Sequence, residues 1–302
     1  MDTLESLRRK MGSAGDLKSV VRSMKAMAAA NIGQYEKAVT SLGDYYYTVS
    51  LGIVAYFRSE KISTINYKKE PKIKDEKKIG AIVFGSDQGL VGQFNDSLAD
   101  FVSDSLNNFP GKKEIWAVGE RVQLRLTDIG FTVTKLFPVP NSIEAITPLV
   151  GQILINSQMR YENDNVQEVY VFHNQSKAGS GYTPVMQRML PLDKKWQNEF
   201  DELNWPTKKL PQVIGDDKPM LSALIREYLF ASLFKACAES LASENASRLA
   251  AMQRAEKNIG ELLDELGHEF HHLRQSSIDE ELFDVVSGFE ALKKSHHIKN
   301  SL

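Results

Sequence analysis

The sequence predicts an α/β fold class in which a small central domain with a mainly parallel sheet lies between two long helices, one from each end of the chain. Apolar residues recur every seven positions in both terminal segments, as they do along a coiled-coil seam. Proline is absent from residues 1–57 and after Pro219. Between these segments, short apolar runs alternate with helical patterns, as in a parallel α/β domain. We expect the N- and C-terminal helices to pair as a long antiparallel coiled coil.

The first helix is predicted over residues 1–57. Its seam positions are apolar or small, apart from two lysines. The two heptad registers are Leu4, Met11, Lys18, Lys25, Ile32, Val39, Tyr46 and Ile53, and Leu7, Ala14, Val21, Ala28, Tyr35, Leu42, Val49 and Tyr56. Glycines interrupt this helix repeatedly, and each weakens an exposed helix by about 1 kcal/mol. A partner helix must therefore compensate.

The second helix is predicted over residues 218–292 and supplies that partner. Its seam is rich in alanine, which permits close approach of two helices. The registers are Leu221, Tyr228, Lys235, Ala242, Leu249, Glu256, Leu263 and Phe270, and Leu224, Ala231, Ala238, Asn245, Met252, Ile259, Leu266 and Leu273. The polar members Lys235, Asn245 and Glu256 can fix the register of pairing at some cost in stability.

The central α/β domain is assigned to residues 79–192. Its predicted strands are apolar runs that end in turn residues, at 78–85, 114–119 and 168–174, and the stretch 183–192 is a further candidate strand. Its predicted helices lie near 94–108, 120–129 and 142–160. The flanking segments are a charged linker over 58–78, an irregular connection over 193–217 and a tail over 293–302.

The bulk composition excludes several classes of protein. The formal net charge of the 302 residues is −2, whereas a generic nucleic-acid binder usually carries a clear basic excess. Cys237 is the only cysteine, so an internal disulfide is impossible, and a reducing compartment is expected. No apolar run reaches the roughly 20 residues that span a bilayer. We therefore expect a soluble protein that meets a membrane only through partners.

The stretch HEFHH at 268–272 raises the alternative of a metallopeptidase. Its H-E-x-x-H spacing would place His268 and His272 one turn apart on a helix, with Glu269 as a general base. Here, however, the stretch lies inside an uninterrupted heptad run. Later acids on the same helix would lie too far along it to complete a tetrahedral site. A solvated helix face is therefore the favoured interpretation.

The loop FGSDQGLVGQFN at 84–95 suggests a phosphate-binding turn, because it follows a strand and precedes a helix. Its glycines are spaced G-x-x-x-G-x-x-G rather than G-x-G-x-x-G, and no Lys-Ser/Thr pair follows. A tight turn with close backbone packing is the favoured alternative.

Charge is distributed unevenly along the two helices. Residues 8–25 carry a basic cluster that includes Arg22, and residues 264–290 carry eight acidic residues against one basic residue, Arg274. In an antiparallel pair these regions approach each other. Spacing alone leaves two readings open, namely mutual neutralisation, which is worth little on a surface, or a surface that contacts another protein.

Three segments of the chain resemble the gamma subunit, or central rotor shaft, of F-type ATP synthases. They are LRRKMGSAGDLKSVVRSMKAMAAANIGQYEKA near the start, GSDQGLVGQFN in the centre, and ESLASENASRLAAMQRAEKNIGELLDEL with LRQSSIDEELFDVVSG near the end. Their order and spacing cover nearly the whole chain. The departures, such as Asp279, Phe283 and Asn245, indicate a divergent or alternate branch of that family.

The resemblance implies a rotary function in which the coiled coil turns inside a ring of three alpha and three beta subunits. It couples ion flow through the membrane ring of c subunits to ATP synthesis or hydrolysis at the alpha/beta sites. The implied partners are that ring, the epsilon subunit and the c-ring, with one copy of this chain per complex and no nucleic acid. The implied location is the cytoplasmic face of a prokaryotic plasma membrane. The chain itself would hold no catalytic site, no cofactor and no metal.

By position, the resemblance also implies which residues contact the alpha/beta ring. Arg274 and Gln275 match a pair that meets a beta loop, and Met24 matches a methionine beside the acidic lever of beta. Arg22 from the basic cluster joins this surface. The polar positions of the C-terminal signature linked to coupling are Arg248, Glu281 and Asp284. A stand-alone coiled-coil scaffold remains a further alternative, and proton or sodium specificity and the physiological direction are set elsewhere.

Overall fold

The computed structural model describes residues 3–58, 78–163, 166–177, 181–192 and 217–299, together with 196, 200, 203, 205–209 and 214. Residues 59–77 of the predicted linker and most of the predicted irregular connection lie outside the described residues. The described elements are α1 (Leu4–Arg58), β1 (Lys78–Phe84), α2 (Phe94–Asn107), β2 (Lys112–Val118), α3 (Glu120–Asp128), β3 (Val133–Phe137), α4 (Ile146–Asn163), β4 (Val166–Ser176), β5 (Tyr182–Leu190) and α6 (Asp217–Lys299). None of the described helices holds a segment long and apolar enough to cross a membrane.

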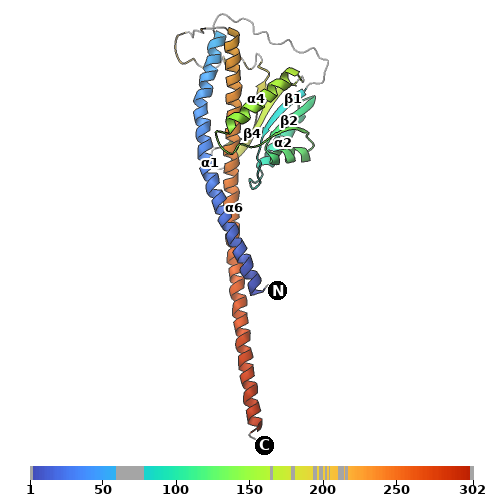
Figure 1. The fold of residues 1–302 in the computed structure, drawn as a ribbon, viewed down its shortest axis with the longest axis vertical. Coiled ribbons are helices and arrows are strands. Elements are labelled where there is room, and N and C mark those ends of the chain that lie inside the picture. Colours follow the sequence, from blue (N-terminus) through green and yellow to red (C-terminus); the bar gives the residue numbers. More distant parts are fainter. Residues whose placement is uncertain are drawn as a thin grey trace. The chain divides into compact units, whose positions relative to one another are not determined.

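The chain divides into two compact units, and each of the two long helices contributes to both. One unit comprises residues 1–26 and 252–302, and the other comprises residues 27–251. In the first unit, α1 and α6 run antiparallel, side by side (Figure 1). Their buried positions fall on the predicted heptads, and they are Leu7, Ala14, Val21, Met252, Ile259 and Leu266. The pairing predicted from the sequence is thereby confirmed within this unit.

In the second unit the remaining halves of α1 and α6 pair in the same antiparallel sense. The rings of Tyr46 and Tyr228 lie 5.4 Å apart, between centroids. Gly52 faces α6 so closely that an added Cβ would come within 2.9 Å of the Leu224 side chain. Of the glycines that interrupt the first helix, Gly52 is therefore the one that a close helix approach explains.

The sheet of the second unit has the strand order β3-β2-β1-β4-β5. β1 pairs in parallel with β2 and β4, and β2 pairs in parallel with β3. β5 is antiparallel to β4. The predicted mainly parallel sheet is confirmed, but β3 was not predicted. Its three central residues are exposed, so this edge strand lacks the apolar run that marks the buried strands.

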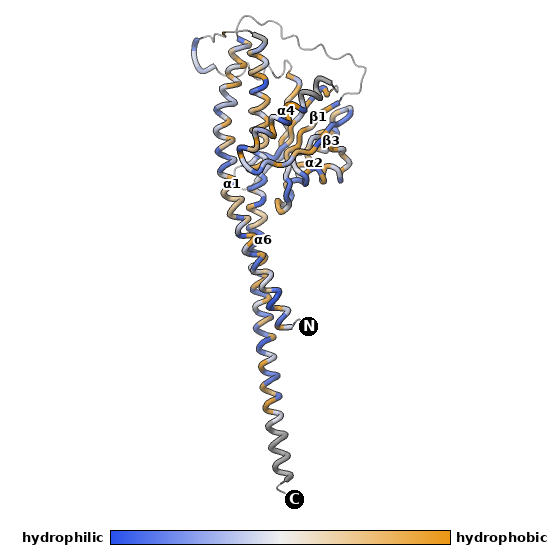
Figure 2. The backbone as a smooth tube through the Cα atoms, viewed as in Figure 1, coloured by the Kyte–Doolittle hydropathy of each residue, from blue (hydrophilic) through white to orange (hydrophobic). Residues whose placement is uncertain are grey.

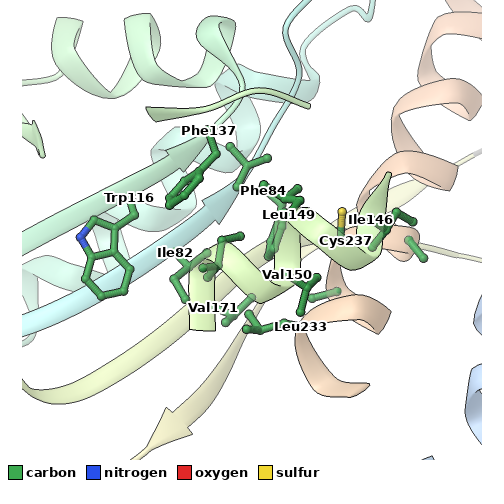
Figure 3. Close-up of a cluster of buried hydrophobic side chains, with 14 of the residues drawn as sticks. Ile82, Phe84, Trp116, Phe137, Ile146, Leu149, Val150, Val171, Leu233 and Cys237 are labelled. Atoms are coloured by element: carbon green, nitrogen blue, oxygen red, sulfur yellow. The ribbon is translucent and has the colours of Figure 1, made fainter. Parts of the chain in front are cut away.

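Helices cover both faces of the sheet. α2 and α3 pack on the face formed by residues such as Ala81, Val83 and Phe172. α4 and α6 pack on the opposite face, formed by residues such as Ile82 and Phe84 (Figure 3). Side chains of a strand alternate between faces, so strands covered on both faces are hydrophobic over much of their length. The coloured parts of α1 and α6, in contrast, mix hydrophilic and hydrophobic residues (Figure 2). The α6 segment around Cys237 thus belongs to the core of the α/β domain.

Cys237 is buried on the α4 and α6 side of the sheet, as expected from its apolar surroundings. Burial, together with the nearby charge of Glu244, raises the pKa of its thiol well above the usual range. A neutral thiol in this position acts as a small apolar group that packs against its neighbours.

Candidate functional site

The glycine-rich loop that follows β1 packs against the start of α3. An added Cβ on Gly85 would come within 2.3 Å of the Val122 side chain. Gly119 has a φ of +115°, and its added Cβ would lie 2.6 Å from the carbonyl oxygen of Ser86. Both positions require glycine, because the loop, β2 and α3 approach one another so closely.

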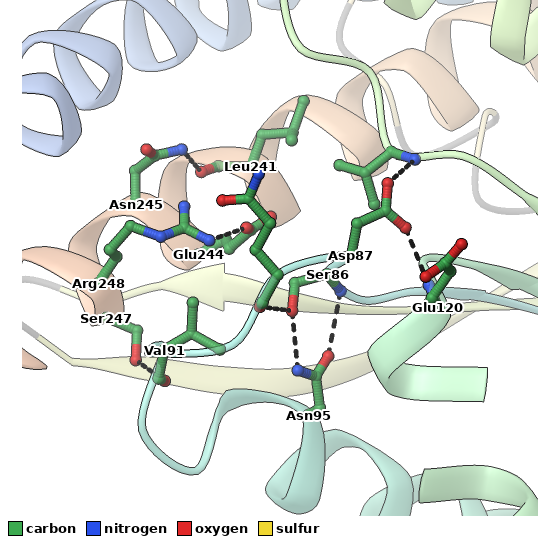
Figure 4. A network of polar contacts seen from close by, with 12 residues as sticks. Ser86, Asp87, Val91, Asn95, Glu120, Leu241, Glu244, Asn245, Ser247 and Arg248 are labelled. Atoms are coloured by element: carbon green, nitrogen blue, oxygen red, sulfur yellow. Dashed lines mark hydrogen bonds and ion pairs between the residues drawn. The ribbon is translucent and has the colours of Figure 1, made fainter. Parts of the chain in front are cut away.

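Polar side chains of the loop bind the loop itself and its neighbours (Figure 4). The Ser86 amide donates to Asn95 Oδ1 at 3.1 Å, and Asn95 Nδ2 donates to Ser86 Oγ at 2.8 Å. The Asp87 carboxylate accepts from the amides of Glu120 at 2.9 Å and Val139 at 2.8 Å. These contacts hold the loop in one conformation and fix it to α3 and to the segment after β3.

Three serines of α6 donate to backbone carbonyls of the sheet domain. Ser240 Oγ donates to the carbonyl oxygen of Phe84 at 3.0 Å. Ser243 Oγ donates to that of Asn174 at 3.1 Å, and Ser247 Oγ donates to that of Val91 at 2.5 Å. All three serines are buried. We call Ser240, Ser243 and Ser247 the serine row.

A buried acid–base pair joins β4 to the same part of α6. His173 Nε2 lies 2.8 Å from Glu239 Oε2, and Gln175 Nε2 donates to Glu239 Oε1 at 3.2 Å. Burial opposes ionisation of Glu239, but the hydrogen bonds and charges of its partners outweigh burial, so the pKa of Glu239 is lowered. The pair therefore favours a charged carboxylate against the sheet.

One turn beyond Glu239 along α6, a second carboxylate is held by an arginine. Arg248 Nη2 lies 2.6 Å from Glu244 Oε1, and their side chains are 13% and 6% exposed. Burial raises the pKa of Glu244, and the guanidinium of Arg248 offsets this only in part. Among the described residues, Arg248 Nε has no hydrogen-bond partner. Among the residues predicted from the sequence to contact partner subunits, only Arg248 lies beside the serine row.

The remaining singled-out residues lie in the first unit and do not converge on one point. Arg22 Nε lies 2.8 Å from Glu256 Oε1, and Lys25 pairs with the other oxygen of the same carboxylate. Hydrogen bonds from Lys25 and Arg22 lower the pKa of Glu256 to about 2. Met24 is half-buried, whereas the side chains further along α6 are exposed, and these are Arg274, Gln275, Glu281 and Asp284.

The HEFHH stretch is helical, and His268, Glu269 and His272 are exposed. Phe270 and Leu273, which the heptads place on the seam, are half-buried. In the part of the chain that the structure describes, no group of three or more His, Cys, Asp or Glu side chains is arranged to hold a metal.

Sequence reasoning missed the serine row and the His173–Glu239 pair. The serines stand at intervals of three and four, which places them on one helix face, and this spacing was a usable signal. Their acceptors lie as many as 156 residues away in the chain, so the sequence alone could not identify them.

Comparisons with known proteins agree along nearly the whole chain. The model of the ATP synthase family matches residues 3–292. The ATP synthase gamma chain of Pasteurella multocida (strain Pm70) is 26% identical over 295 residues, which cover 95% of this chain and 99% of that relative. The gamma chain of Actinobacillus pleuropneumoniae serotype 5b (strain L20) is 27% identical over 297 residues, with coverage of 95% and 99%.

Solved structures share the fold at low sequence identity. A chain of the Euglena gracilis mitochondrial ATP synthase (OSCP/F1/c-ring, rotational state 3) aligns with a TM-score of 0.62 and 16% identity, over 96% of this chain and 94% of that one. A chain of the Tetrahymena thermophila mitochondrial ATP synthase (central stalk/c-ring) aligns with a TM-score of 0.54 and 19% identity, over 78% and 99%. The chain therefore belongs to the ATP synthase family and is a gamma subunit of the central stalk.

Proposed function

We propose that this gamma subunit is the rotor shaft that couples ion flow through a membrane c-ring to ATP synthesis or hydrolysis at alpha/beta catalytic sites. The proposal rests on the contacts of α6 with both the α/β domain and α1. Within the second unit it packs in the core of the α/β domain, pairs with α1, and is bonded to strand ends through the serine row. Such a helix can transmit a rotation of the domain to the coiled coil, because it cannot move independently of either.

The structural relatives support the same role. They come from a central stalk with a c-ring, a rotor, and an F1 assembly with a c-ring. We infer that this chain contacts an alpha3beta3 ring and a c-ring, that it also binds an epsilon subunit, and that one copy is present per complex. We place it at the cytoplasmic face of a prokaryotic plasma membrane, attached through the complex, since the gamma chains of Pasteurella multocida and Actinobacillus pleuropneumoniae that it resembles are bacterial.

The contact surface for the alpha/beta ring is proposed to include Met24, Arg22 and the exposed polar residues of α6, which are Arg274, Gln275, Glu281 and Asp284. The exposure of this last group leaves the side chains accessible to a partner. Arg248 differs from them, because it is mostly buried and paired with Glu244. We propose that Arg248 affects coupling by holding that part of α6 in place.

Assembly and coupling test the proposal. The chain is co-expressed with the alpha, beta, epsilon and membrane subunits encoded by the same organism, purified, and reconstituted in lipid vesicles. We expect the assembled complex to hydrolyse ATP and to transport ions, and we expect the isolated chain to do neither. Steady ATP hydrolysis by the isolated chain, or failure to co-purify with alpha and beta, would contradict the proposal.

A further inference from the structure

We propose that the serine row fixes the angle of α6 about its own axis against the sheet, and so forms the joint that bears torque between the α/β domain and the coiled coil. The three serines are positioning residues in this account. The inference rests on the rotor function proposed above, and it assigns the transmission of torque to particular bonds.

Geometry is the first argument. Ser240, Ser243 and Ser247 follow the spacing i, i+3, i+7, which places them along one face of a helix. Their acceptors belong to three separate pieces of the domain, namely the last residue of β1, the end region of β4 and the glycine-rich loop. A helix held at three heights on one face cannot turn about its axis without breaking these bonds.

The apolar contacts around the serine row are less directional than its hydrogen bonds. On the same part of α6, the buried neighbours include small residues such as Ala236, Ala238 and Ala242. Hydrophobic burial depends on area and has little directional preference. Hydrogen bonds weaken steeply when their angle changes. The apolar contacts thus hold α6 against the sheet, while the serines select its angle.

The acceptors are rigid, which makes the row a stiff joint. Phe84 pairs with Val118 of β2 at the end of β1, and Asn174 pairs with Pro184 of β5. The loop that presents the Val91 carbonyl is held by the contacts of Ser86, Asp87 and Asn95. Serine adds little flexibility of its own, because its side chain is short and has few rotamers to lose.

Two further contacts support the row at the level of β4. Ser176 Oγ lies 3.1 Å from Ser243 Oγ. The Glu239 carboxylate, one residue before Ser240, meets His173 at 2.8 Å and Gln175 at 3.2 Å. The joint therefore contains a charged contact beside neutral ones, and all of its partners belong to the second unit.

Ser232 provides a matched control on the same helix. Its side chain is buried like those of the row. Its hydroxyl has no hydrogen-bond partner among the described residues. Replacing it with alanine therefore changes a buried serine of α6 without removing a bond to the sheet.

The test measures the torsional stiffness of the shaft in the assembled complex. The alpha3beta3 ring is fixed to a surface, and a bead is attached to the exposed face of α2 through Asp100→Cys, since the native Cys237 is buried. Angular fluctuations of the bead are recorded with the complex stalled without ATP, and rotation is recorded with ATP. The variants are Ser240→Ala/Ser243→Ala/Ser247→Ala, Ser243→Ala alone, and Ser232→Ala.

We expect the angular variance of the triple variant to rise at least about twofold, because three directional contacts are lost. Ser243→Ala should give an intermediate rise, and Ser232→Ala should match the parent. The proposed joint would be overturned if Ser243→Ala, or an assembled triple variant, showed the same angular variance as Ser232→Ala. The rotor function would still stand in that case, because the parent complex would still rotate. A parent complex that hydrolyses ATP without rotating the bead would instead overturn the rotor function, and the joint with it.

Discussion

At the residue scale, three buried serine hydroxyls join α6 to the sheet in the second unit. Each of the three satisfies a main-chain carbonyl that water cannot reach. Each also leaves room for α6 to approach the sheet, as a larger polar side chain would not. The same side chain thus contributes both to burial and to alignment.

Ser243→Ala should destabilise the full-length chain by about 1–3 kcal/mol, because it leaves the Asn174 carbonyl without its donor. Ser232→Ala should change the free energy of unfolding little, or raise it, because the hydroxyl that it removes has no partner in the described structure. Urea unfolding of the two variants and the parent, followed by circular dichroism, measures the difference. Equal losses in both variants would show that the bond to Asn174 contributes nothing.

Glu256 gives the first unit a dependence on pH with a definite sign. Its pKa is lowered from 4.5 to about 2 in the folded chain by Lys25 and Arg22. A lowered pKa in the folded state means that the stabilisation is complete above pH 4.5 and is lost as the pH falls towards 2. Thermal unfolding should therefore show the parent more stable than Glu256→Gln at pH 7, with the difference vanishing near pH 2.

Glu261→Gln is the control for that measurement. Glu261 lies on the same helix and pairs with Lys257, at 3.6 Å, with both side chains well exposed. Such surface pairs contribute little to stability. If Glu261→Gln lowers the melting temperature at pH 7 as much as Glu256→Gln does, the ion pairs of Glu256 with α1 stabilise the chain no more than an ordinary surface pair.

At the scale of elements, the two long helices could be predicted because their signal is local and repeated. The seven-residue period fixes which residues face a partner helix, and the buried positions Leu7, Ala14 and Val21 follow it. Strands β1, β2 and β4 were predicted for a similar reason, since burial on both faces gives each of them a short run of apolar residues. β3 escaped prediction because its only buried residue is Phe137.

The candidate site could be predicted only in part. The glycine-rich loop was visible in the sequence. The reason why Gly85, and Gly119 after β2, must be glycine was not visible, because it depends on Val122 and Ser86 packing against them in the fold. Arg248 was singled out by resemblance, whereas its burial beside Glu244 required the fold. Polar contacts between distant segments have no periodic signature, so the sequence cannot reveal them.

Two glycines of α1 allow the effect of helix propensity on stability to be measured apart from the effect of helix packing. Gly43 is exposed, and an added Cβ there would meet nothing within 4 Å. Gly43→Ala should therefore stabilise the full-length chain by up to about 1 kcal/mol. Gly52→Ala should gain less or lose stability, because its Cβ would press on Leu224 at 2.9 Å. Thermal unfolding of both variants compares them, and a larger gain for Gly52→Ala would contradict the close approach of the two helices.

At the scale of the whole molecule, residues that hold the subunit together are distinct from exposed residues that can contact partner subunits. Arg274 belongs to the second group, because it is exposed on α6. Arg274→Ala should change the free energy of unfolding of the chain by no more than about 0.5 kcal/mol. In the assembled complex it should lower ATP hydrolysis or the number of ions moved per ATP.

Arg254→Ala, on an exposed position of the same helix, serves as the control for Arg274→Ala. It keeps the change of charge and of side-chain size the same while altering a position outside the proposed contact surface. Identical activity and identical coupling in the two variants would remove Arg274 from that surface, and a large loss of stability in the isolated Arg274→Ala chain would assign it a structural role.

The central claim is that this subunit turns as one shaft while the catalytic ring stays still. The most direct measurement follows a bead attached through Asp100→Cys on a surface-fixed complex as ATP is supplied. The account predicts continuous rotation in one direction, which stops when ATP is withdrawn. Steady ATP hydrolysis by complexes whose beads keep a fixed mean angle would contradict it.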